Sequence, residues 1–72
     1  MNMIEVFKTN VEDTNVACRM KEVLQQHFPS SRINFDLHDC DRILRMEGVD
    51  FTPEKVMGLV EQEGFSCSIL DG

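Results

Sequence analysis

Apolar and polar residues follow two different spacings along the chain, and the first is alternation. Residues 32–38 (RINFDLH) alternate strictly between polar and apolar, which is typical of a strand with one face buried. Residues 3–9 (MIEVFKT) also predict a strand, although the adjacent Phe and Lys blur which face is buried. Residues 42–47 (RILRME) return as a hairpin from the second strand, and residues 65–70 (FSCSIL) predict a last short strand.

The second spacing is helical. Residues 14–28 and 53–63 carry apolar residues at three- and four-residue steps with charged residues between them, so each predicts an amphipathic helix. Asp13 or Thr14 can cap the first helix, and a Thr-Pro-Glu sequence gives the second a cap, a proline at its first position and a favourable charge. Gly64 is placed to end the second helix in a left-handed conformation.

The predicted order of elements is βαββαβ. Two right-handed βαβ crossovers joined by a hairpin give a four-stranded antiparallel sheet with two helices on one face, an α+β fold of the ferredoxin-like kind. The 72 residues form one domain, 1–72, because a chain this short buries only about 60% of its unfolded surface and cannot support a second core. A deep active-site cavity is not expected.

Charge and cysteine content narrow the classes of partner. Thirteen acidic residues against seven basic ones give a net charge of −6, which phosphate backbones repel, so we expect no nucleic-acid partner. We expect no membrane partner either, because the chain lacks an apolar run of about 18 residues and its polar start does not resemble a signal peptide. Three widely spaced cysteines indicate free thiols and a cytoplasmic protein.

Three groups of residues share the order and spacing of a known family. They are Val16, Met20, Val23 and Leu24; the stretch INFDL leading into Ile43–Gly48; and Val56, Val60, Gly64 and Phe65. In these residues the chain resembles the heavy-metal-associated domain family, which comprises small copper chaperones and the N-terminal modules of metal-pumping ATPases. The resemblance covers nearly the whole chain and implies the same fold.

The chain departs from this family at the loop that binds metal. The family holds its ion on two thiolates of a Met-Thr-Cys-x-x-Cys loop, and the matching stretch here reads VEDTNV over residues 11–16. Asp13 and Val16 stand at the two cysteine positions, and neither offers the thiolate that Cu(I) requires. The family's metal transfer is therefore not expected, and we interpret Asp13 as a helix cap and Val16 as a packing residue.

A metal site with other ligands is an open alternative. The first loop, the start of the first helix and the hairpin should lie at one end of the fold, which gathers Cys18, His38 and Cys40 with neighbouring aspartates. Thiolate, imidazole and carboxylate together suit Zn²⁺, which takes about four ligands. The same hairpin residues also fit an ordinary solvated turn, and no known zinc spacing is present.

Catalysis is not expected, because no catalytic triad, paired carboxylates or glycine-rich phosphate loop can be assembled. We therefore expect no enzyme and no cofactor. The uncovered sheet face, where Phe7 and Ile43 are predicted to project, and the free edge of the second strand favour association with a protein partner or with a second copy. The first hypothesis is thus a protein-interaction or regulatory module; the alternative is a protein that binds Zn²⁺ or another transition metal in metal homeostasis or transport.

Overall fold

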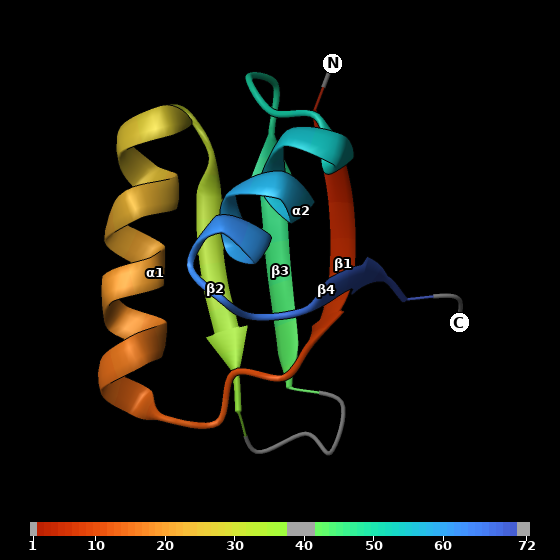
Figure 1. Cartoon of the computed structure of the whole chain (residues 1–72). Coiled ribbons are helices and arrows are strands. Elements are labelled where there is room, and N and C mark those ends of the chain that lie inside the picture. The colour runs from red at the N-terminus through yellow and green to blue at the C-terminus, as the bar shows by residue number, and fades with distance from the viewer. Residues whose placement is uncertain (1, 38–41, 71–72) are drawn as a thin grey trace.

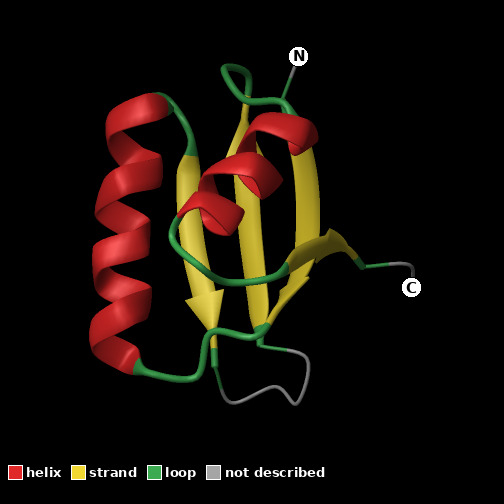
Figure 2. Ribbon diagram, viewed as in Figure 1, coloured by secondary structure: helices red, strands yellow, loops and turns green. Residues whose placement is uncertain are grey.

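The computed structural model describes residues 2–37 and 42–70, and it has the βαββαβ order that the sequence predicts (Figure 1). The elements are β1 (Met3–Thr9), α1 (Thr14–His27), β2 (Arg32–Asp36), β3 (Ile43–Gly48), α2 (Pro53–Gln62) and β4 (Cys67–Ile69). The predicted ferredoxin-like fold is confirmed: both helices lie on one face of a four-stranded antiparallel sheet (Figure 2).

The strands are ordered β2-β3-β1-β4. In the register, Leu44 of β3 lies between Phe7 of β1 and Phe35 of β2, and Thr9 of β1 lies opposite Cys67 of β4. Residues opposite one another point to the same face of a sheet. Phe7, Leu44 and Phe35 therefore all face the helices, and β2 and β4 form the two edges of the sheet.

Helix α1 begins directly after Asp13, one of the two residues that the sequence predicts as its N-cap. The Asp13 carboxylate accepts hydrogen bonds from the backbone N–H of Asn15 at 2.7 Å and of Val16 at 3.4 Å, which satisfies two donors that the first turn leaves free. The helix ends at His27 with Phe28 as its C-cap, immediately before a proline that cannot continue it. The interpretation of Asp13 as a cap is confirmed.

Helix α2 also follows its sequence signals. The Thr52 hydroxyl accepts a hydrogen bond from the Lys55 N–H at 3.4 Å, and Pro53 occupies the first helical position. After the last turn Gly64 adopts a φ of 93°, which is the left-handed conformation that glycine takes without strain. Strand β4 follows this turn and begins at Cys67, two residues later than the sequence predicts.

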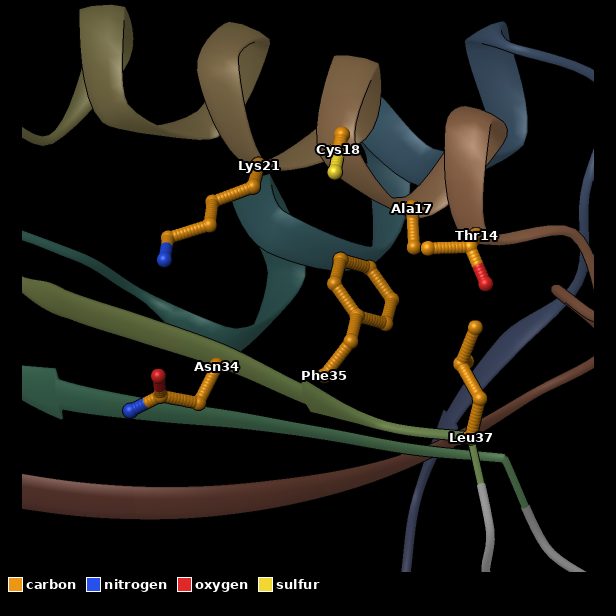
Figure 3. A pocket seen from close by; sticks show the side chains of 7 residues that line it. All are labelled: Thr14, Ala17, Cys18, Lys21, Asn34, Phe35 and Leu37. Carbon is orange, nitrogen blue, oxygen red and sulfur yellow. The ribbon is translucent and has the colours of Figure 1, made fainter.

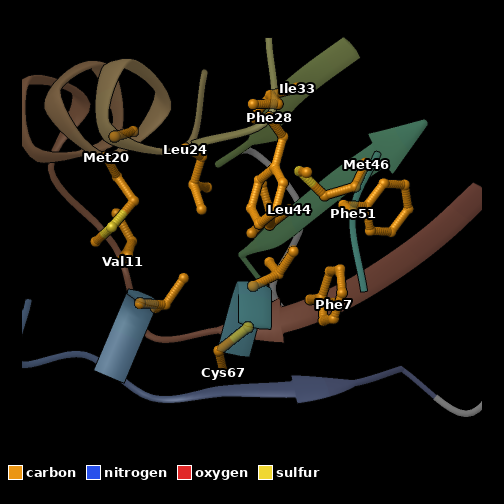
Figure 4. Packing of buried hydrophobic residues seen from close by; sticks show 13 residues of the cluster. Phe7, Val11, Met20, Leu24, Phe28, Ile33, Leu44, Met46, Phe51 and Cys67 are labelled. Atoms are coloured by element: carbon orange, nitrogen blue, oxygen red, sulfur yellow. The ribbon is translucent and has the colours of Figure 1, made fainter. Parts of the chain in front are cut away.

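The core lies between the sheet and the two helices (Figure 4). Its fully buried large side chains are Phe7, Val11, Met20, Leu24, Leu44, Met46, Val56 and Val60. Each such burial contributes about 1.5–3 kcal/mol relative to exposure. Phe28 and Phe51 close one end with an edge-to-face contact, their ring centroids 6.4 Å apart.

One predicted surface residue belongs to this core. Phe7 is 0% exposed, so the prediction that it projects from the open sheet face is wrong. Its partner in the register is Leu44, which faces the helices, and the next residue along β3, Ile43, must then face the other way. Phe7 and Ile43 cannot share a face, and it is Ile4 and Val6 that accompany Ile43 on the open one.

Candidate functional site

The loop that the family uses for metal lies at the end of the sheet toward which β1 and β2 both run (Figure 1). Asp13 caps α1 there with its carboxylate, and Val16 is half-buried against the core. Neither position supplies sulfur to an ion. At these two positions the chain forms the start of α1, where the Asp13 carboxylate accepts hydrogen bonds from the backbone N–H groups of Asn15 and Val16.

Hydrogen bonds also fasten this loop to the start of β3. The Thr9 hydroxyl donates to the carbonyl oxygen of Arg42 at 2.7 Å and accepts from the Val11 N–H at 3.2 Å. The Arg42 guanidinium forms an ion pair with Glu12 at 3.2 Å. The ion pair is exposed and contributes little to stability, whereas the Thr9 hydrogen bonds are partly or fully buried and hold the loop in place.

The three predicted metal ligands are not brought together in the described structure. Cys18 lies on the exposed side of α1, and His38 and Cys40 fall outside the described residues. Within residues 2–37 and 42–70 no group of three or more His, Cys, Asp or Glu side chains is arranged to hold a metal ion. The zinc alternative therefore stays a prediction.

A groove runs between α1 and the edge strand β2, with a volume of about 320 Å³. It is lined by Thr14, Ala17, Cys18, Lys21, Asn34, Phe35 and Leu37. Figure 3 shows the side chains of Phe35, on β2, and Leu37, directly after it, pointing toward α1, with that of Leu37 directed at Thr14 and Ala17. Phe35 and Leu37 are half-buried, so the floor of the groove is apolar and Lys21 and Cys18 form its upper rim.

The groove continues along the other half of β2. A second hollow of about 270 Å³ shares Lys21 and Asn34 with the first and extends to Gln25 and Arg32. The Gln25 amide donates to the Ser31 carbonyl at 2.9 Å and to the Phe28 carbonyl at 3.1 Å. These bonds fix the turn after α1, so the far end of the groove has a defined shape.

Among the strands of the described residues, β2 pairs with β3 alone, so its outer edge is open along this groove. An edge strand has backbone N–H and C=O groups that no neighbouring strand satisfies, and these groups are a template for pairing with another chain. Arg32, Asn34 and Asp36 are exposed on it. Edge and groove together form one surface, which we call the β2 edge: residues Arg32–Asp36 with the groove-facing side of α1.

The open sheet face has a mixed character. Ile4 is 54% exposed, and Val6 and Ile43 are half-buried beside it. Across the same face the register places Arg32 opposite Glu47, and Asn34 opposite Arg45. A few apolar side chains surrounded by charged ones are ordinary on a protein surface, so this face is a weaker candidate site than the β2 edge.

The two described thiols differ in environment. Cys67 is buried on β4, and burial, with a smaller contribution from the Glu61 carboxylate, raises the pKa of its thiol to about 12. Near neutral pH, a thiol with so high a pKa is almost entirely protonated, and only the deprotonated thiolate is nucleophilic. Cys18, in contrast, is exposed at the rim of the groove.

The element order, the strand order and the shared helix face define a small ferredoxin-like domain. No family model matches the sequence, and no curated protein matches it either. The likeness to heavy-metal-associated domains therefore rests on the residues named above and on the fold, which agrees with it. Neither of the described helices has the length and apolar character needed to cross a bilayer.

The residues of the β2 edge could be read from the sequence only in part. The alternation of Ile33, Phe35 and Leu37 correctly identified a strand. It gave no sign that Phe35 and Leu37 are only half covered, because that depends on where α1 lies over the sheet. Lys21 and Ala17 likewise become neighbours of β2 only in the folded chain.

Proposed function

We propose that this chain is a non-enzymatic protein-interaction module of heavy-metal-associated-like architecture, which acts in the reducing cytoplasm and docks a protein through the β2 edge. The observation that carries the proposal is the unpaired edge of β2 beside a groove with an apolar floor. Addition of a strand to such an edge draws affinity from main-chain hydrogen bonds and specificity from the adjacent side-chain pockets.

Two further features support this function over metal transfer. The loop that would carry two thiolates has instead a capping carboxylate and a half-buried valine, and soft ions bind neither. The surface of the β2 edge sets two cations, Lys21 and Arg32, against one carboxylate, Asp36, in a chain whose net charge is −6. Its chemistry thus differs from that of the acidic surface as a whole.

Zinc binding through Cys18, His38 and Cys40 remains the alternative, and no contact in the described residues favours it. Cys18 lines the groove with Lys21 and Phe35, a position that serves docking.

Peptide selection on metal-free protein tests the proposal. Linear peptides from a random display library are selected on the full chain, and their binding is mapped by ¹H–¹⁵N chemical shifts. We expect the shifts to concentrate at Arg32–Asp36 and at the groove-facing residues of α1. Cys18→Trp fills the groove and should abolish binding, while Cys18→Ala leaves the groove open and should preserve it.

The proposal fails if no peptide is selected, or if the selected peptides perturb surfaces away from β2. It also fails if Cys18→Trp, shown to be folded by its amide spectrum, binds as well as Cys18→Ala does.

A further inference from the structure

The two halves of β2 are complementary about its middle residue: the charged ends are opposite in sign, and the next residue inward on each side is apolar. Arg32 and Asp36 are the two ends, Ile33 and Phe35 are the apolar pair, and Asn34 is the centre. In antiparallel pairing about Asn34, Arg32 lies opposite the partner's Asp36, and Ile33 lies opposite the partner's Phe35. Opposite charges and apolar pairs placed directly across from one another both stabilise a ladder.

We propose that the occupant of the β2 edge is a second copy of this chain, bound through antiparallel β2–β2 pairing centred on Asn34. The inference rests on the proposed function, because it uses the same edge, and it names the partner. The pairing is isologous: a two-fold axis relates the copies, and the same five residues serve both. It joins the two sheets into one continuous sheet with all helices on the same side.

Other ways of pairing two β2 strands lose the opposite-charge and apolar pairs that the register centred on Asn34 forms. Parallel pairing in register would set Arg32 against the partner's Arg32 and Asp36 against the partner's Asp36, and like charges across a ladder are destabilising. A shift by one residue would turn the partner's helix-facing residues to the open face. A shift by two leaves one charged end of each strand without its counterpart. Only the register centred on Asn34 uses all five residues.

The folded positions of these side chains agree with their roles. Arg32, Asn34 and Asp36 are exposed, so they are accessible to a partner strand. Asp36 already makes an interaction within its own chain, and a carboxylate has enough acceptor sites on its two oxygens to bind the partner's Arg32 as well. Half-buried Phe35 and Leu37 would be covered further by the second copy.

Two electrostatic terms oppose the pairing. Each copy carries a net charge of −6, but at physiological salt the Debye length is about 8 Å, so distant charges repel weakly while the adjacent Arg–Asp pairs are screened less. Lys21 shares the groove with Asn34, so the axis brings two lysines toward each other. Their long stems allow the ammonium groups to point into water.

Charge exchange at the strand ends tests the inference. The wild-type chain is measured by sedimentation equilibrium across the micromolar to millimolar range, and we expect a monomer–dimer equilibrium. Arg32→Asp alone, or Asp36→Arg alone, places like charges across the ladder and should weaken the dimer roughly tenfold. An equimolar mixture of these two variants restores every opposite-charge pair and should form a heterodimer at least as tight as the wild type.

The matched control is Lys55→Asp, which makes the same charge change at an exposed site on α2, an element that is not part of the β2 edge. It should leave the dimer unchanged. Amide spectra of each variant confirm that it is folded. The inference is overturned if the wild type is monomeric throughout, or if the mixture of variants stays monomeric. If the chain is monomeric but peptides still bind at β2, the docking function stands and only the second copy is rejected as the occupant of the edge.

Discussion

The Asp50 carboxylate accepts a hydrogen bond from the backbone N–H of Ser30 at 2.9 Å, and so joins two connections that are twenty residues apart. The Ser31 hydroxyl donates to the other oxygen of the same carboxylate. Ser31 is buried in the turn after α1, whereas Asp50 follows β3. One exposed aspartate thus satisfies two donors and holds the entry to β2 against the exit from β3.

This carboxylate makes stability depend on pH. The Ser31 hydrogen bond, and less strongly that of the Ser30 N–H, lower the pKa of Asp50 although partial desolvation opposes them. A lowered folded pKa gives stability above the unfolded value of about 3.9, and this stability is lost as pH falls through the folded value. Asp50→Asn should therefore be less stable than the wild type at neutral pH, and the difference should shrink in acid.

Urea denaturation at a series of pH values measures this difference. Ser31→Ala removes the larger cause and should move the pKa of Asp50 upward in a ¹³C carboxyl titration. An unchanged Asp50 titration in Ser31→Ala would contradict the assignment.

Two glycines respond oppositely to an added methyl group. A Cβ at Gly48 would lie 2.5 Å from the Ser31 Oγ and 2.8 Å from the Ser31 Cα, which is backbone and cannot move aside. Gly48→Ala should therefore lower the free energy of unfolding by about 1–3 kcal/mol. At Gly58, within α2, nothing lies within 4 Å of the added Cβ, so Gly58→Ala should raise it by about 0.5–1 kcal/mol. Equal effects of the two substitutions in urea would refute this account.

The cap of α1 is testable without any metal. Asp13→Ala removes the acceptor of two backbone hydrogen bonds and should lower the free energy of unfolding by about 0.5–2 kcal/mol. Asp13→Ser keeps a capping oxygen and should recover most of the loss. A neutral Asp13→Ala, or one that destabilises only when metal is present, would show that the carboxylate is not acting as a cap.

We expect that the same loop can be made to bind Cu(I) by restoring two cysteines. Asp13→Cys with Val16→Cys places two thiols where the resembled family has them, and we expect tight Cu(I) binding by native mass spectrometry. The change costs packing at half-buried Val16 and the cap at Asp13. If the double variant folds but binds Cu(I) no better than the wild type, the loop does not have the family's shape.

The thiols at positions 18 and 67 should react at very different rates. The pKa of about 12 for Cys67 leaves only about one part in ten thousand as thiolate at pH 8, and the residue is also buried. Iodoacetamide should label exposed Cys18 in the folded protein and Cys67 only after unfolding, as followed by peptide mass spectrometry. Rapid labelling of Cys67 in the folded chain would contradict its burial.

The sequence predicts the elements well because their signals are local. The caps Asp13 and Thr52 and the turn at Gly64 lie next to the residues they organise, so both helices begin at the residues predicted, Thr14 and Pro53. Phe7 was misassigned because Ile4 and Val6 form a competing apolar pair on the same strand. Only the register with β3, which sets Phe7 opposite Leu44, determines which set is buried.

The candidate site was less predictable for the same reason. The charges and apolar residues of β2 can be read directly from the sequence, and the predicted fold correctly gives this strand a free edge, but the groove beside that edge depends on how α1 packs over the sheet. The position of Cys18 shows the same limit, because its place at the groove rim depends on the approach of α1 to β2.

The interior position of β1 has a consequence for synthesis on the ribosome. Although it emerges first, β1 pairs with residues 43–48 and 67–69, so both of its neighbours are translated later. Until then Phe7 and its apolar neighbours have no sheet to join, and a nascent chain that stops before residue 67 exposes an uncovered interior strand. Such an unpaired strand is a point of aggregation, so we expect chains truncated before residue 67 to aggregate more readily than the full chain.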